Sequence, residues 1–162
     1  MAIQKYSHIG VTVSDLDVAR RFFVEGLGFT PVIDGESERT MSVSGDVGKK
    51  VANFLEVDDF AAEIAFVERD GQVLELVNYL TPEPELAHRR PMNICGLSHL
   101  CFLVNDIDAV AQRLRDLGGH ILEDTKISTD LPDGRPRTYM LCLAPDASVR
   151  VELIETDGLP NT

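Results

Sequence analysis

The feature that most constrains the fold of this chain is an internal repeat. The segment SHIGVTVSDLD (residues 7–17) aligns with SHLCFLVNDID (residues 98–108) when the chain is shifted by 91 positions, and Ser, His, Val and two Asp residues coincide. With the same shift, Gly28 falls on Gly119. The match falls on the same predicted structure twice, so we interpret it as a duplicated structural unit.

Each copy begins with a predicted strand that runs into a predicted helix. Residues 6–13 and 97–104 are rich in aliphatic and aromatic side chains, with polar residues inserted at a period of two. Ser14 and Asn105 are good N-cap residues, and acidic residues follow them in the first turn. Apolar residues then recur at helical spacing, and glycines follow at the expected helix ends.

Three shorter strands are predicted after each helix. In the first half they lie near residues 29–35, 50–57 or 62–69, and 72–80, with Asp70 and Gly71 as a hairpin turn. In the second half they lie near residues 120–127, 137–144 and 149–155. The unit is therefore β-α-β-β-β, present twice.

The repeat also predicts how the chain is organised. We expect an α+β fold in which two tandem βαβββ modules, residues 1–80 and 97–162, form one domain. Residues 81–96 contain three prolines and are predicted to be the linker between them. The first module is longer, and its extra residues fall around 36–62, where a longer loop either shapes a substrate pocket or forms idle surface.

Composition and charge exclude several classes of function. Hydrophobic residues make up 44% of the chain, as expected of a globular protein, and no apolar run approaches the roughly 20 residues that span a bilayer. The net charge of −12 repels phosphate backbones and anionic headgroups, so we expect neither nucleic-acid nor membrane binding. The first residues lack the apolar stretch of a signal peptide, and the cysteines form no C-x-x-C pair, so we expect a cytoplasmic protein with reduced thiols.

Two histidines and two glutamates occupy equivalent places in the repeat. His8 and His99 stand on the first strand of each half, and Glu75 and Glu152 stand on the last strand, flanked by aliphatic residues. An ionised carboxylate in such a strand is costly unless it is paired or binds a metal. Any one of these residues alone is more often an ordinary hydrogen-bonded or solvated side chain. Two matched pairs predict one divalent metal ion, Zn, Ni, Co, Mn or Fe.

The pairing of these ligand types on two βαβββ modules resembles the vicinal-oxygen-chelate superfamily. This superfamily includes glyoxalase I, methylmalonyl-CoA epimerase, extradiol dioxygenases and the fosfomycin and bleomycin resistance proteins. The stretches HIGVTVSDLDVARRFFVEGLGF (8–29) and GLSHLCFLVNDIDAVAQRLRDLGG (96–119) are similar to the opening strand and helix of each family module. The resemblance covers the chain from about Tyr6 to Glu155, and it implies a curved mixed sheet around the metal site.

The resemblance also implies a reaction. Family members use the metal to chelate neighbouring oxygens of a substrate, and a fourth protein ligand at Glu75 resembles bacterial glyoxalase I and is close to the epimerase pattern. This implies proton transfer next to a metal-bound carbonyl, by a lyase or an isomerase, with Glu152 as the base. The family's epimerase has a second carboxylate in a loop that corresponds loosely to Asp46, for which an ordinary turn residue is the alternative interpretation.

Three further residues are candidate substrate contacts. Arg135 and Arg137 are suited to a carboxylate or a phosphate, and Tyr139 to the wall of a pocket, although such residues are also common as solvated or packing side chains. The expected substrate is a small molecule: a thiol adduct, an acyl-CoA or a hydroxy-keto compound. A partner subunit often completes the site in this superfamily, so we expect a homodimer.

Two other classes of function stay open. One is an Fe(II) ring-cleaving dioxygenase in which Glu75 does not bind the metal, and iron content together with oxygen uptake with catechols would identify it. The other is a non-catalytic protein that binds a small molecule such as a drug. A pure binder has no need of buried carboxylates, so the complete set of ligand-type residues argues against it.

Overall fold

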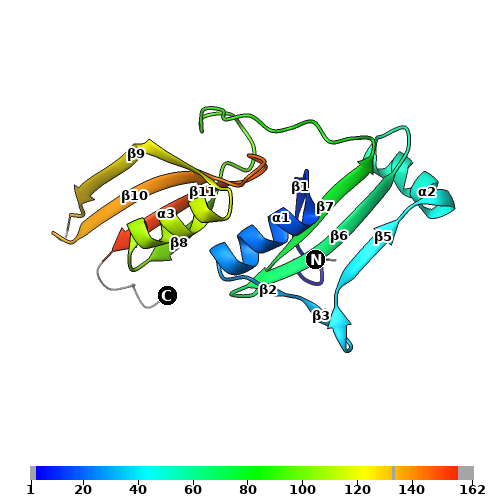
Figure 1. The fold of residues 1–162 in the computed structure, drawn as a ribbon, viewed down its shortest axis with the longest axis horizontal. Coiled ribbons are helices and arrows are strands. Elements are labelled where there is room, and N and C mark those ends of the chain that lie inside the picture. Colours follow the sequence, from blue (N-terminus) through cyan, green and yellow to red (C-terminus); the bar gives the residue numbers. More distant parts are fainter. Residues whose placement is uncertain (1–2, 133, 157–162) are drawn as a thin grey trace. The chain divides into compact units, whose positions relative to one another are not determined.

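The computed structural model describes residues 3–132 and 134–156, and the chain divides into two compact units, Met1–Leu86 and Ala87–Thr162 (Figure 1). Each unit has a main sheet with a helix packed against it. In each sheet the first strand of the unit pairs in parallel with the last one. The predicted α+β fold with a repeated strand, helix and strand order is therefore confirmed.

The first unit has a mixed sheet with strand order β1-β7-β6-β2, and β5 also pairs with β6. The small strands β3 and β4 form a separate hairpin. Its elements, in chain order, are β1 (Ile9–Val13), α1 (Leu16–Arg21), the π-helical turn η1 (Phe22–Gly26), β2 (Thr30–Pro31), β3 (Ile33–Asp34), β4 (Ser37–Glu38), β5 (Thr40–Val43), α2 (Gly45–Leu55), β6 (Ala61–Arg69) and β7 (Gln72–Thr81).

The second unit has a four-stranded sheet with strand order β8-β11-β10-β9. It repeats the core arrangement of the first unit, because β8, β11 and β10 correspond to β1, β7 and β6. Its elements, in chain order, are β8 (Leu100–Val104), α3 (Ile107–Asp116), β9 (His120–Asp130), β10 (Pro136–Leu143) and β11 (Arg150–Thr156).

Alternation along the last strand of each unit separates the two faces of its sheet. Leu74 and Leu76 of β7 are buried on the face that α1 contacts, and Val151 and Leu153 of β11 are buried on the face that α3 contacts. Successive side chains of a strand point to opposite faces. The residues between them, including both predicted glutamate ligands, therefore point away from the helices.

The two helices begin one residue later than predicted. The side chains of Asp15 and Asp106, and not those of Ser14 and Asn105, cap α1 and α3. Each aspartate accepts a hydrogen bond of 2.9 Å from a backbone N–H three residues ahead. A carboxylate at this position also interacts favourably with the positive end of the helix dipole, which a neutral side chain does less strongly.

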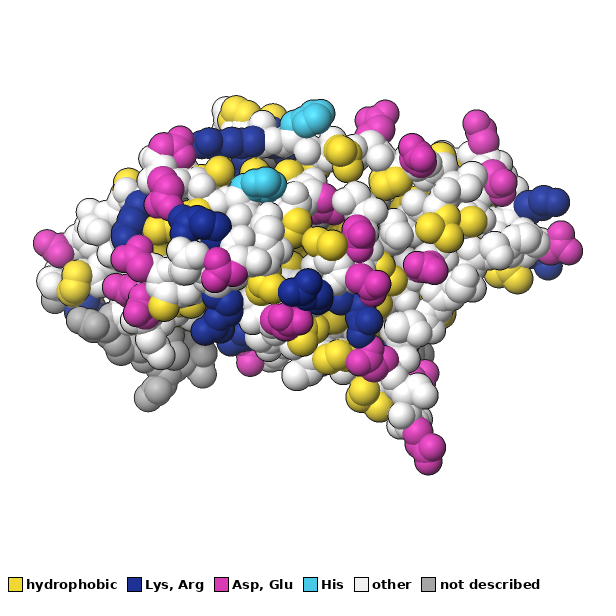
Figure 2. Space-filling view, viewed as in Figure 1, with side chains coloured by type: hydrophobic (Ala, Val, Ile, Leu, Met, Phe, Trp, Pro, Cys, Tyr) yellow, Lys and Arg dark blue, Asp and Glu magenta, His cyan; other side chains and the backbone are white. Residues whose placement is uncertain are grey.

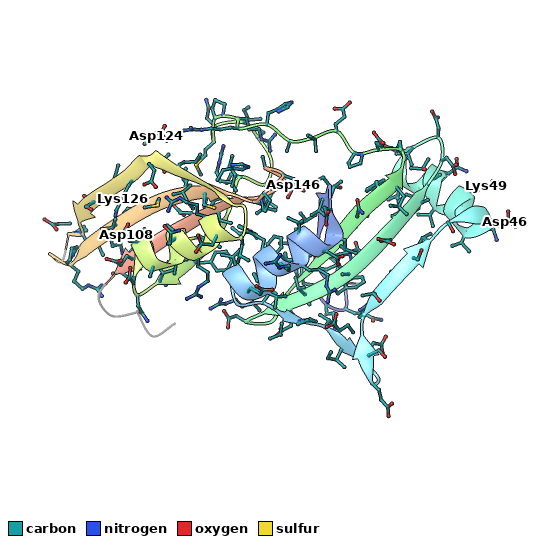
Figure 3. All side chains as sticks on the ribbon, viewed as in Figure 1. Asp46, Lys49, Asp108, Asp124, Lys126 and Asp146 are labelled. Atoms are coloured by element: carbon teal, nitrogen blue, oxygen red, sulfur yellow. The ribbon has the colours of Figure 1, made fainter. Side chains whose placement is uncertain are left out.

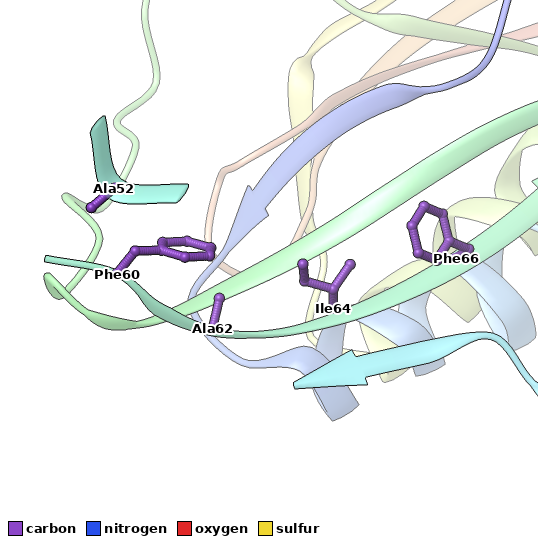
Figure 4. Close-up of a cluster of buried hydrophobic side chains, with 5 residues drawn as sticks. All are labelled: Ala52, Phe60, Ala62, Ile64 and Phe66. Carbon is purple, nitrogen blue, oxygen red and sulfur yellow. The ribbon is translucent and has the colours of Figure 1, made fainter. Parts of the chain in front are cut away.

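The insertion in the first unit contains a helix where one prediction placed a strand. Residues 50–57 were a candidate strand, but α2 covers Gly45–Leu55, and the strand is β6 instead. The apolar residues of this stretch fit either period, and packing decides between them: Ala52 belongs to a buried cluster with Phe60, Ala62, Ile64 and Phe66 (Figure 4).

The first unit also contains a tight turn and a close helix contact. The predicted turn at Asp70 and Gly71 is confirmed, since Arg69 pairs with Gln72 and both turn residues have positive φ angles. Helix α2 packs closely at Gly48 against the residue before β6, where an added Cβ would collide with the Phe60 carbonyl oxygen. Within the described residues, no helix is both long and apolar enough to cross a membrane.

Candidate functional site

The structure brings the four predicted ligands together as two separate pairs, one in each unit. In the first unit, His8 Nε2 lies 3.2 Å from Glu75 Oε2, and in the second unit, His99 Nε2 lies 3.2 Å from Glu152 Oε2. Each histidine directly precedes the first strand of its unit, and each glutamate lies on the neighbouring parallel strand. The sequence repeat therefore corresponds to a repeat of side-chain geometry.

A serine orients each histidine ring. The Ser7 hydroxyl lies 2.9 Å from His8 Nδ1, and the Ser98 hydroxyl lies 2.8 Å from His99 Nδ1. When Nδ1 carries the proton and donates it to the serine oxygen, the lone pair of Nε2 is free on the side of the carboxylate. Both serines coincide in the sequence repeat, but their role becomes evident only from these contacts.

The geometry of each pair fits two ligands of one metal ion. Donor atoms about 2.1 Å from a common ion lie about 3.0 Å apart at a right angle and about 3.4 Å apart at a tetrahedral angle. The observed separation of 3.2 Å falls between these values in both units. The four side chains keep 22–37% of their surface exposed, so their donor atoms are accessible.

Each unit by itself contains two of the four predicted ligands. Across the described residues, no group of three or more His, Cys, Asp or Glu side chains is assembled into a metal site. A protein-bound divalent ion of the expected kinds takes at least three protein ligands. Neither pair alone reaches this number.

The two pairs differ in the residue opposite the glutamate. Gly10 is the register partner of Glu75, and a Cβ added there would lie 3.8 Å from Glu75 Oε2. Cys101 is the register partner of Glu152, and its thiol forms a hydrogen bond with that carboxylate. Partial burial, together with this hydrogen bond and the negative charge of Glu152, raises the pKa of the Cys101 thiol to about 11.

The first unit adds an aromatic and a cationic side chain to the same face. The rings of Phe66 and His8 meet edge to face with centroids 6.0 Å apart, and the Arg39 guanidinium carbon lies 4.1 Å from the Phe66 centroid. Neither residue was predicted from the sequence to lie at the site. The hairpin turn at residues 70–71 sets the register that makes Phe66 the partner of Glu75, so it was the available signal for Phe66.

The predicted substrate contacts lie along β10 and the segment before it. Tyr139 and Arg137 are half-buried, and they lie two and four residues before Leu141, the register partner of Glu152, so they share the sheet face of Glu152. Arg137 pairs with Thr156, four residues beyond Glu152, which is a distance of about 13 Å along the strand. Arg135 is exposed and precedes the strand. Of the three, Tyr139 is nearest to the His99 and Glu152 pair.

Asp46 lies in a helix and not in the predicted loop. It belongs to the first turn of α2, is exposed, and lies at the outer end of that helix (Figure 3). The strand before α2 ends at Val43, which pairs with Ala62, whereas Glu75 pairs with Phe66, about 13 Å further along β6. This separation exceeds hydrogen-bonding reach, so the role of Asp46 as a base stays a prediction without geometric support.

The chain belongs to the Glyoxalase/Bleomycin resistance protein/Dioxygenase superfamily, whose family model matches residues 5–130. It is 36% identical over 129 residues to a 2-epi-5-epi-valiolone epimerase from Actinomyces sp, a match that covers 77% of this chain and 66% of the epimerase, just under two thirds of its length. It is also 26% identical to the uncharacterized protein YwkD of Bacillus subtilis, over 86% of this chain and 89% of YwkD.

Solved structures show the same fold. A glyoxalase family protein from Bacillus cereus superimposes with a TM-score of 0.71 at 23% identity, covering 98% of this chain and 99% of that one. The fosfomycin resistance protein FosX from Listeria monocytogenes, solved with Mn(II) and sulfate, superimposes with a TM-score of 0.54 at 16% identity, covering 94% and 93% of the two chains.

Proposed function

We propose that this protein is a divalent-metal-dependent enzyme that moves a proton next to a carbonyl group of a small molecule, as a lyase or an isomerase. The observation that carries the proposal is the repeated His–Glu pair, with the same 3.2 Å separation and the same serine contact in both units. A pair formed by chance in one unit has no reason to recur with this geometry in the other.

His8, Glu75, His99 and Glu152 would hold one ion, two ligands coming from each unit. The two units belong either to one chain or to the two subunits of a homodimer, which we also propose. A bound Zn, Ni, Co, Mn or Fe ion would polarise a substrate carbonyl and so make the adjacent C–H group more acidic. Two imidazoles and two carboxylates suit such ions, and the exposed side of each pair is open to a substrate.

The protein's own residues then move the proton. Glu152 takes the proton from the carbon next to the carbonyl, and the electron pair of that C–H bond passes toward the carbonyl oxygen. In a glyoxalase-type enzyme the proton is then delivered to the neighbouring carbon, and in an epimerase a proton exchanged with solvent is delivered to the opposite face of the same carbon. No electrons leave the substrate. Ser7 and Ser98 keep the imidazoles oriented throughout.

The similarity to an epimerase supports this class of reaction. Inverting a carbon next to a carbonyl requires removal of a proton from one face and its delivery to the other, which is the chemistry proposed here. At 36% identity, the Actinomyces epimerase favours the redox-neutral reaction over oxygen-dependent ring cleavage. The substrate class stays that of the sequence prediction: a thiol adduct, an acyl-CoA or a hydroxy-keto compound.

Metal content of the purified protein tests the proposal. We expect near-stoichiometric divalent metal in the wild-type protein and its loss in the His8→Ala, Glu75→Ala and His99→Ala variants. The Glu63→Ala variant, which removes an exposed carboxylate from β6, should retain it. Proton transfer is then tested with the glutathione adduct of methylglyoxal and with methylmalonyl-CoA in D₂O, where deuterium from the solvent should enter the carbon that exchanges its proton. Iron that is indifferent to Glu75→Ala would favour the dioxygenase instead, and a metal-free protein would leave only a binding function.

A further inference from the structure

A cavity in the second unit gathers three arginines. It measures about 350 Å³ and is lined by Arg89 and Arg90, from the segment before β8, and by Arg150, at the start of β11. Figure 2 shows acidic side chains scattered over much of the molecule, with basic side chains among them on the visible face of this unit. In a chain with a net charge of −12, a convergence of three guanidinium groups is unexpected unless they bind something.

The partners of these arginines leave positive charge for a ligand. Arg89 forms an ion pair of 3.0 Å with Asp124, which lies on β9 (Figure 3). One terminal nitrogen of Arg150 donates to the carbonyl oxygen of Arg90, while its Nε–H is buried and has no acceptor among the described residues. Buried donors normally have an acceptor, so this group favours an acceptor in the cavity.

The strand register places the cavity beside the His99 and Glu152 pair. Leu141 and Leu122 line the cavity, and Leu141 is the register partner of both Leu122 and Glu152. Arg150 lies two residues before Glu152 on β11, so the two side chains share a face and their backbones are about 7 Å apart. A small molecule that reaches Glu152 can therefore also reach the arginines.

We infer that this cavity binds a carboxylate or phosphate group of the substrate. Arg90 and Arg150 would hold the oxyanion through charge-assisted hydrogen bonds, and the adjoining carbons would pack against Leu122, Leu141 and Met92. This assignment rests on the proposed function in one respect, namely that the anion belongs to the molecule on which Glu152 acts. Binding of the oxyanion itself does not depend on the metal.

The test is anion binding to the full-length protein in the presence of EDTA. Isothermal titration with inorganic phosphate and with malonate, at constant ionic strength, should give saturable binding of at least one of them to the wild-type protein. The Arg150→Met and Arg90→Met variants remove the charges but keep the apolar stems. Each should weaken binding roughly 10- to 100-fold, the loss expected for a charge-assisted hydrogen bond.

The Arg113→Met variant is the matched control, because Arg113 is an exposed residue of α3, which covers the opposite face of the sheet. It should bind the anion as the wild type does. Arg90 is exposed, so Arg90→Met tests the inference even if Arg150→Met fails to fold. Binding of only phosphate or only malonate would identify the kind of oxyanion. Absence of saturable binding, or equal affinity in the wild type and both variants, would overturn the inference.

Metal content separates this test from that of the proposed function. The Arg90→Met protein should retain its metal, and the Glu75→Ala protein should retain its anion binding. The two outcomes can therefore fail independently.

Discussion

Removing the two serine hydroxyls should weaken metal binding without removing a ligand. Ser7 lies 2.9 Å from His8 Nδ1, and Ser98 lies 2.8 Å from His99 Nδ1. The net contribution of one hydrogen bond to the free energy is about 0.5–1.5 kcal/mol. The histidine side chains are 37% and 29% exposed, so water replaces part of each lost contact. We therefore expect about 1 kcal/mol for Ser7→Ala and for Ser98→Ala, or about fivefold weaker binding in each.

The double variant tests whether both pairs bind the same ion. If both histidines bind one ion, the two losses should add, giving about 25-fold weaker binding. Competition with a fluorescent zinc chelator measures this affinity, and Ser128→Ala, which removes an exposed hydroxyl bonded to Thr138, is the control. Affinity that is unchanged in the double variant would refute the assigned role of the serines. A loss caused by only one serine would mean that only one pair binds the ion.

Two further predictions concern packing and thiol chemistry. Gly48→Ala should lower the free energy of unfolding of the first unit by roughly 1–3 kcal/mol, because the new Cβ meets the Phe60 carbonyl oxygen and α2 must shift. Urea denaturation measures this change, and unchanged stability would contradict the close packing. In metal-free protein, alkylation of Cys101 should be slow at pH 8 and rise about tenfold per pH unit toward its pKa of about 11, because only the thiolate reacts. Mass spectrometry can follow this rate against that of the exposed Cys95, and fast alkylation at pH 8 would show that the thiol is not held protonated.

The repeat made the His–Glu pairs predictable. A shift that superimposes His8 on His99 also identifies equivalent strands, and each last strand contains one glutamate among aliphatic residues. A period of two then fixes which face that glutamate occupies. The order of elements along the chain and the residues of the pairs therefore follow from local patterns that occur twice.

Features without a counterpart in the other half were harder to predict. The stretch around residues 50–57 has apolar side chains that fit a strand or a helix, and only contact with Phe60 and its neighbours favours the helix. Asp46 was assigned to a loop for the same reason. The alternation of side chains along a strand predicts that Arg150 and Glu152 share a face. The contact of residues 89–92 with this sheet could not be predicted in the same way, because that segment has no periodic pattern.

In each unit, a different segment packs against the sheet face that carries the predicted glutamate ligand. In the first unit α2 packs over the cluster that contains Ile64 and Phe66, on the face that carries Glu75. In the second unit residues 89–92 lie against Leu122 and Leu141 on the face that carries Glu152.

These bordering segments differ between the two units, whereas a His–Glu pair occurs in both. Mutations can therefore reshape a border while the paired ligands and their strands stay intact. In a duplicated fold of this kind, the residues proposed to bind the metal are separate from the segments that border the site. The α2 insertion and residues 89–92 are therefore the places to vary in a library designed for new substrates.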